Sequence, residues 1–207
     1  MRQVTQFNPC YGLLFVAAIL LAGCGSTPTA EFYTLSPLDS LQRASSKLAV
    51  GEKVAVGVGP VEFSKALKKP QIVSRTSPHR LRMDEFHRWG SPLDEDFTQV
   101  LAENISMLLA TDRVAVFPWG KHFRPTYQIV MSVLRLEGEP GGGVVLNARW
   151  ALLGEDGNEL TMRRSVIEEQ PGRGGYEALV AAQSRAIGTL SREIAQEIYR
   201  LESGGGF

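Results

Sequence analysis

Residues 144–167, VVLNARWALLGEDGNELTMRRSVI, contain the pattern that decides the fold. From Val144 to Leu152 every second residue is apolar, which is the period of a strand buried on one face. Gly154-Glu155-Asp156-Gly157-Asn158 is a turn sequence, so Leu160 to Ile167 is expected to return as the antiparallel partner. Thr126 to Leu136 alternates in the same way upstream. Together these segments predict a meander of three strands.

Two amphipathic helices are expected to cover this sheet. The first begins near Ser91, a candidate cap followed by Pro92 and, three residues after the cap, by Asp94. The second runs from about Tyr176 to Leu201, and its long apolar stripe should lie across the meander. The apolar positions of the first helix are Phe97, Val100, Leu101, Ile105, Leu108 and Leu109, and those of the second are Leu179, Val180, Ala186, Ile187, Leu190, Ile194, Ile198 and Leu201.

Shorter elements complete the domain. We expect strands at 32–35, at 53–58 ending before Pro60, at 71–75, at 81–83 and at 114–117, with at most a one-turn helix around 64–68. The fold class is therefore mixed α/β, a single compact domain in which two main helices pack on a twisted β-sheet. The domain is expected to span residues 31–203, and residues 204–207 to form a disordered tail.

The start of the chain has the organisation of an export signal. Arg2 is the only charged residue before an apolar run from Leu13 to Ala22. Ten residues suit the ~7–15-residue core of a signal peptide and fall short of the ~20 that span a bilayer as a helix. Leu21-Ala22-Gly23-Cys24 resembles the lipobox of bacterial lipoproteins, in which the Gly23–Cys24 bond is cleaved and Cys24 is lipidated.

That resemblance implies an anchored protein. Residues 1–23 would be the signal peptide, and residues 24–30 a flexible tether that begins with lipidated Cys24. In enterobacterial-type systems an Asp directly after the lipidated Cys retains a lipoprotein at the inner membrane, whereas this chain has Gly25 and Ser26. We therefore expect it at the periplasmic face of the outer membrane, with its acyl chains in the inner leaflet.

Bulk composition narrows the function classes. The formal net charge is +0 and the isoelectric point is about 6.8, which gives no support to a nucleic-acid partner. The two cysteines are Cys10, which lies within the signal, and Cys24. The folded part therefore has no thiol for a disulfide, for thiolate catalysis or for metal binding. The covalent lipid on Cys24 is the only attached group that we expect.

Enzyme signatures are weak. Gly57-Val58-Gly59-Pro60 begins like a dinucleotide-binding loop but lacks the third glycine and the helix start, and Gly141-Gly142-Gly143 fits a hairpin loop. His79, His87 and His122 have no metal-ligand spacing, and no Gly-x-Ser-x-Gly motif is present. We predict no catalytic residue, no metal site and no enzyme activity.

A basic segment is the best candidate for a binding surface. Between Lys65 and Arg88 there are seven Lys or Arg residues and two acids. Arginine and tryptophan are over-represented where binding energy concentrates. A solvated basic face is the alternative interpretation, and Trp89 could equally be a core anchor. The partner-binding candidates are Gln71, Arg75, Arg80, Arg82, Phe86, Arg88 and Trp89.

With these residues placed, the chain resembles the auxiliary lipoproteins of ABC-type transport systems. The resemblance extends over nearly the whole mature chain, and it rests on the order and spacing of several segments. Those segments are Leu21 to Cys24, Phe32-Tyr33-Thr34-Leu35, Val54 to Val61, Pro70 to Arg75, and Arg88-Trp89-Gly90-Ser91-Pro92-Leu93.

The resemblance implies a non-enzymatic outer-membrane subunit of an intermembrane lipid transport system built on mammalian-cell-entry (MCE) proteins. Its role would be to dock the periplasm-spanning MCE protein, and because that partner is a ring, self-association into a homo-oligomer is also implied. Charge reversal at Arg75 and Arg82 is then expected to spare folding and weaken capture of the partner. A periplasm-facing lipid-binding module and an assembly lipoprotein for an outer-membrane β-barrel remain open as alternatives.

Overall fold

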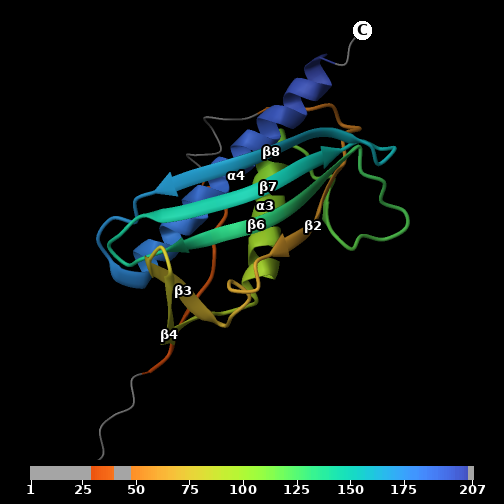
Figure 1. Cartoon of the computed structure of the whole chain (residues 1–207). Coiled ribbons are helices and arrows are strands. Elements are labelled where there is room, and N and C mark those ends of the chain that lie inside the picture. Colours follow the sequence, from red (N-terminus) through yellow and green to blue (C-terminus); the bar gives the residue numbers. More distant parts are fainter. Residues whose placement is uncertain (1–28, 40–47, 205–207) are drawn as a thin grey trace, which may run out of the picture.

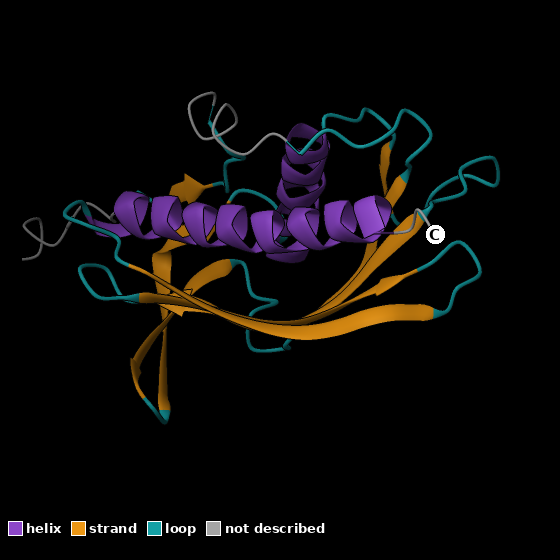
Figure 2. Cartoon of the chain, turned by 90° about the horizontal axis from the view of Figure 1, so that it is seen from above, coloured by secondary structure: helices purple, strands orange, loops and turns teal. Residues whose placement is uncertain are grey.

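The computed structural model describes residues 29–39 and 48–204 of the chain. They form an eight-stranded sheet with two helices on one of its faces (Figures 1 and 2). The strands are β1 (Glu31–Tyr33), β2 (Val56–Phe63), β3 (Gln71–Ser77), β4 (Arg80–Trp89), β5 (Val114–Val116), β6 (Tyr127–Gly138), β7 (Val144–Leu153) and β8 (Glu159–Glu169), and the helices are α3 (Leu93–Leu109) and α4 (Gly175–Gly204). The mixed α/β single domain with two main helices is confirmed.

The predicted meander forms one side of the sheet, with β8 at its edge and β6 next to the remaining strands. β6, β7 and β8 pair antiparallel, with Leu136 opposite Leu146 and Leu146 opposite Ile167. The alternating apolar residues of β7, from Val144 to Leu152, all point into the core, where none is more than 2% exposed. On its other edge, β6 pairs in parallel with β2 and forms a single bridge to β3. The period-two pattern therefore predicted this part of the sheet correctly.

Both helices bury the apolar faces that the sequence predicts. α4 packs along β6, β7 and β8, whereas α3 crosses behind it and contacts β2 and β5 (Figure 2). Inside the contact between the helices, the Asn104 amide donates to the Ser191 hydroxyl over 3.2 Å and its carbonyl oxygen accepts from the Leu38 N–H at 2.8 Å. Residues 34–39 are thereby fixed between α3 and α4.

One glycine makes this arrangement possible. A Cβ at Gly188 of α4 would lie 2.6 Å from the Leu38 Cδ2 atom, which is closer than carbon atoms approach in proteins. Gly188 thus allows the 34–39 segment to pass against the helix.

One local prediction around β2 is wrong, namely the end of the strand before Pro60. The strand continues through Pro60 to Phe63, because the register against β6 shifts between Val58 and Val61 and this irregularity accommodates a residue without a ladder N–H. Residues 64–68 form a single turn, within the limit of one helical turn that was expected there, closed by a hydrogen bond of 2.9 Å from the Leu67 N–H to the Ser64 carbonyl.

Two further predictions fail at the entry to α3. Pro92, not Ser91, occupies the cap position, and no side chain caps the helix. The Pro92 carbonyl instead accepts from the N–H groups of Glu95 (3.1 Å) and Asp96 (3.0 Å). The preceding strand is also far longer than the predicted 81–83 segment, because β4 extends from Arg80 to Trp89.

The chain outside residues 29–39 and 48–204 includes the expected signal peptide, Gly23, Cys24 and most of the tether, so these predictions lie outside the described residues. Helix α4 includes Gly204, and the rest of the expected tail is likewise not described. None of the helices in the described part has the length and apolar character needed to cross a membrane.

A buried carboxylate on α4 stabilises the helix against the meander. Glu197 is 4% exposed and accepts hydrogen bonds from Arg200 (2.6 Å) and from Arg163 of β8 (2.6 Å). The hydrogen bond from Arg200 is the main reason that the pKa of Glu197 lies below its ordinary value, and the charge of Arg163 adds to this effect against the opposing effect of burial.

Because its pKa is lower in the folded state, the Glu197 carboxylate stabilises the fold above its unfolded pKa of about 4.3, and this contribution is lost as pH falls through the folded pKa. Glu197→Gln should therefore lower the free energy of unfolding by about 1–3 kcal/mol at pH 7. Urea unfolding from pH 7 to pH 3 checks this, with exposed Glu103→Gln as the control. A difference from wild type that does not shrink at acid pH would contradict the assignment.

Candidate functional site

The β3–β4 hairpin is the most prominent surface feature. It projects from the sheet on the side opposite the helices (Figure 2). Arg80, Arg82 and Phe86, three of the predicted binding residues, are exposed on it. Met83 of the same hairpin is 45% exposed and was not singled out by the sequence pattern. The hairpin therefore presents basic and apolar side chains together.

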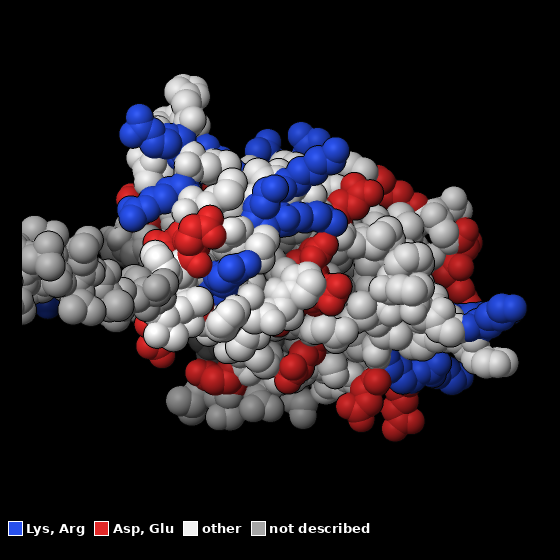
Figure 3. Space-filling model, turned by 90° about the horizontal axis from the view of Figure 1, so that it is seen from below, with Lys and Arg blue, Asp and Glu red and all other residues white. Residues whose placement is uncertain are grey.

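Charge is unevenly distributed around this hairpin. In the view from below, most Lys and Arg side chains lie along the upper part of the surface, from the projecting hairpin at the upper left to the upper centre, with others at the right and with Asp and Glu between and around them (Figure 3). A neutral protein thus has a locally basic region. Such a region favours an acidic partner through complementarity of charge.

The remaining candidates of the segment are less available to a partner. The Gln71 amide donates to the Glu85 carboxylate at 3.0 Å, and Arg88 is half-buried. Trp89 is 5% exposed and belongs to the hydrophobic core, and its backbone N–H donates to the Pro70 carbonyl at 2.8 Å. The core-anchor interpretation of Trp89 is therefore correct, and its assignment as an accessible contact is wrong.

Arg75 also has a role within the fold. Its guanidinium contacts the carboxylate of Glu137, which is 2% exposed and also accepts from Arg135 at 2.9 Å. Removing a partner from a buried charge is costly. Arg75→Glu would place a second carboxylate beside Glu137, so from the structure we expect this reversal to destabilise the fold instead of sparing it.

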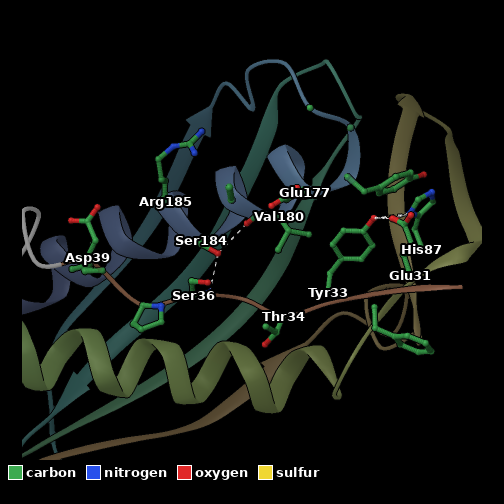
Figure 4. Close-up of a pocket in the computed structure, with 17 residues that line it drawn as sticks. Glu31, Tyr33, Thr34, Ser36, Asp39, His87, Glu177, Val180, Ser184 and Arg185 are labelled. Atoms are coloured by element: carbon green, nitrogen blue, oxygen red, sulfur yellow. Dashed lines mark hydrogen bonds and ion pairs between the residues drawn. The ribbon is translucent and has the colours of Figure 1, made fainter.

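A groove lies beside the base of the β3–β4 hairpin, between β1 and α4 (Figure 4). Its walls are β1 with residues 34–39 and the first turns of α4, and its volume is about 970 Å³. At one end the rings of Tyr33, His87 and Tyr176 meet. His87 stacks on Tyr176 with ring centroids 3.9 Å apart and planes inclined by 18°, and the Tyr33 centroid lies 5.7 Å from that of His87.

Hydrogen bonds fix these rings. The Tyr33 hydroxyl donates to Glu31, so the contact of 2.9 Å between that hydroxyl and Nδ1 of His87 requires the imidazole to donate. The Tyr176 hydroxyl donates to Asp84 at 3.2 Å. Burial is the main cause that raises the pKa of both tyrosines, followed for Tyr33 by the hydrogen bond to Glu31. Both hydroxyls therefore stay protonated at neutral pH.

The sequence motifs that weakly suggested enzymes have structural explanations. Gly57 lies in β2, where a Cβ would approach the Trp119 ring to 2.6 Å, so the glycine is needed for packing. Gly141, Gly142 and Gly143 form the loop between β6 and β7, as predicted. His87 is held by aromatic neighbours, and the described residues contain no group of three or more side chains able to hold a metal ion.

Residues 33–195 match the family model described as the ABC-type transport auxiliary lipoprotein component. The chain belongs to this family. It is 28% identical over 189 residues to the intermembrane transport lipoprotein PqiC of Escherichia coli strain K12, an alignment that covers 91% of this chain and 97% of the relative. The family resemblance expected from the sequence is confirmed, and the chain is an auxiliary lipoprotein of a transport system, a class defined by transport and not by catalysis.

Solved structures share the fold. A crystal structure of an uncharacterized protein superposes with a TM-score of 0.66 at 23% identity, covering 82% of this chain and 99% of the other. A protein from Xanthomonas campestris gives the same TM-score of 0.66 at 16% identity, covering 85% and 99%. The curled sheet with two helices is therefore the architecture of this group.

Proposed function

We propose that this protein is the outer-membrane lipoprotein subunit of an MCE/ABC-type intermembrane lipid transport system and that it docks the periplasm-spanning MCE protein. Membership of the auxiliary lipoprotein family supports a role in transport. The name of the relative PqiC, an intermembrane transport lipoprotein, supports a position between two membranes. Gly25 and Ser26 after Cys24 favour the outer membrane.

The projecting β3–β4 hairpin carries the docking part of this proposal. Arginine and methionine are enriched at protein interfaces, and hot spots contain arginine more often than other charged residues. Arg80, Arg82, Met83 and Phe86 provide these groups along β4, in a hairpin that extends beyond the body of the sheet. Because β3 and β4 pair with each other, these side chains lie on a regular strand instead of on a loop.

Charge reversal on the hairpin should weaken docking. Arg80→Glu combined with Arg82→Glu removes two exposed donors whose side chains have no ion-pair partner in the described part of the chain. Loss of a well-placed arginine contact costs about 1–3 kcal/mol, or roughly ten- to a hundredfold in affinity. Binding of the purified MCE partner from the same transport system, measured by biolayer interferometry, checks this.

The loop between β5 and β6 supplies a matched control. Lys121→Glu with Arg124→Glu makes the same change of charge at exposed positions of this loop, at the opposite end of the molecule (Figure 1). The control should bind like wild type. If the hairpin variant also stays within twofold of wild type while folding normally, the hairpin is not the docking surface and the basic face is merely solvated.

A further inference from the structure

The groove beside α4 has the size and composition of a ligand site. Its volume of about 970 Å³ lies at the upper end of the range of about 300–1,000 Å³ for small-molecule pockets. Pro37, Leu38, Val180 and Ala181 give it an apolar stretch, and the Tyr33, His87 and Tyr176 rings close one end (Figure 4). It is thus an amphipathic trough with a polar, aromatic head.

The aromatic end is arranged to attract positive charge. A tyrosine ring attracts a cation to its face through its quadrupole, and the attraction strengthens when the site is shielded from water. Tyr33 and Tyr176 each use their hydroxyl as a donor to a carboxylate, which holds the ring planes in place and leaves no free phenolic donor for an anion. Their ring centroids lie 6.3 Å apart with planes inclined by 44°, so the two rings contact each other at an angle, and His87 stacks on the Tyr176 ring.

The charges around the groove also favour a positively charged ligand. The carboxylates of Glu31 and Glu177 line its aromatic end, and Glu31 is largely exposed to the groove and to solvent. Among the described residues that line the groove, Arg185 is the only Lys or Arg. Its guanidinium lies 3.3 Å from the Glu169 carboxylate and donates to the Gln170 carbonyl at 2.7 Å. No Lys or Arg therefore lines the aromatic end among the described residues of the groove.

We propose that this groove binds an organic ammonium group, with the cation against the Tyr33 and Tyr176 rings and beside Glu31. An aminophospholipid headgroup and a free amine both supply this chemistry, and the apolar stretch from Leu38 to Val180 would receive the adjoining alkyl part. The proposal does not depend on docking to an MCE protein. The three rings come from β1, β4 and α4, so the ligand would also tie the first strand to the hairpin base and the helix.

The test uses the full lipidated chain in a non-ionic detergent. The probes are dihexanoyl phosphatidylethanolamine, dihexanoyl phosphatidylglycerol as the lipid without an amine, and free choline and ethanolamine, each titrated by saturation-transfer NMR. We expect the ethanolamine lipid to bind at least about tenfold more tightly than the glycerol lipid. If the free amines bind, the ammonium group is sufficient for recognition. If the ethanolamine lipid binds and the free amines do not, the ligand is a lipid headgroup together with its alkyl chains.

Variants separate recognition from folding. Glu31→Gln and Tyr176→Leu should each weaken binding about tenfold, and Tyr176→Phe should retain most of it because the ring face remains. Glu62→Gln and Tyr199→Leu make the same changes at exposed positions outside the groove and should have no effect. Equal affinity for the two lipids, absence of binding by every probe, or undiminished binding by Glu31→Gln and Tyr176→Leu would each overturn the proposal.

Discussion

Replacing Leu190 with Asp should unfold the domain. Leu190 is 0% exposed and lies in the middle of α4, within the core that this helix forms with α3 and the meander. Truncation of a buried leucine to alanine alone costs about 2–5 kcal/mol. An unpaired carboxylate in an apolar site adds the cost of desolvating a charge or of protonating it. The sum is comparable to a typical total stability of about 5–15 kcal/mol.

Circular dichroism of a fragment covering residues 25–207 checks this prediction. Leu190→Asp should abolish the cooperative thermal transition, and Gln196→Asp should keep it, because Gln196 is exposed on the same helix. Substitutions at such exposed positions usually change stability by less than about 0.5 kcal/mol. A cooperative, near-wild-type melt of Leu190→Asp would mean that α4 does not pack on the sheet.

The elements with regular burial are the ones that the sequence predicts. β6, β7 and β8 alternate because one face meets α4, and α3 and α4 show helical spacing because each buries one stripe. The β4 strand is different, since its residues Arg80 to Phe86 are exposed or half-buried and carry no apolar period. Its length comes from pairing with β3, which a local pattern does not reveal.

The candidate binding residues fall into exposed residues and residues that contact the rest of the fold, and the local sequence does not separate the two groups. Composition identifies a basic segment, but it does not distinguish Arg80, which is exposed, from Arg75, which contacts buried Glu137 on β6. The two residues of that ion pair are 62 positions apart. Trp89 likewise enters the core because β4 ends beside β1 and the start of α3. Tertiary contacts decide which residues of the segment are available to a partner.

The groove has no signal in the sequence. Tyr33 and His87 are separated by 54 positions, and Tyr176 follows much later at the start of α4. The parallel pairing of β1 with β4, which puts Glu31 opposite His87 and Tyr33 opposite Trp89, brings the first two together. The sequence places Tyr33 in a short strand and in a segment of the family resemblance, and it shows for His87 no metal-ligand spacing. Without the sheet order, no spacing rule connects these residues.

Replacing Cys24 with Ser should remove the protein from the outer membrane. Serine has no thiol to form the thioether that carries the lipid. Each methylene of the acyl chains that is buried in the bilayer contributes about 0.8 kcal/mol to membrane affinity, so loss of these chains should remove the anchor. Detergent-free fractionation on a density gradient and the intact mass measure the outcome. Cys10→Ser is the matched control, because that residue lies within the expected signal peptide and should affect neither mass nor location. A Cys24→Ser protein that remains in the outer-membrane fraction would show that another part of the molecule provides the anchor.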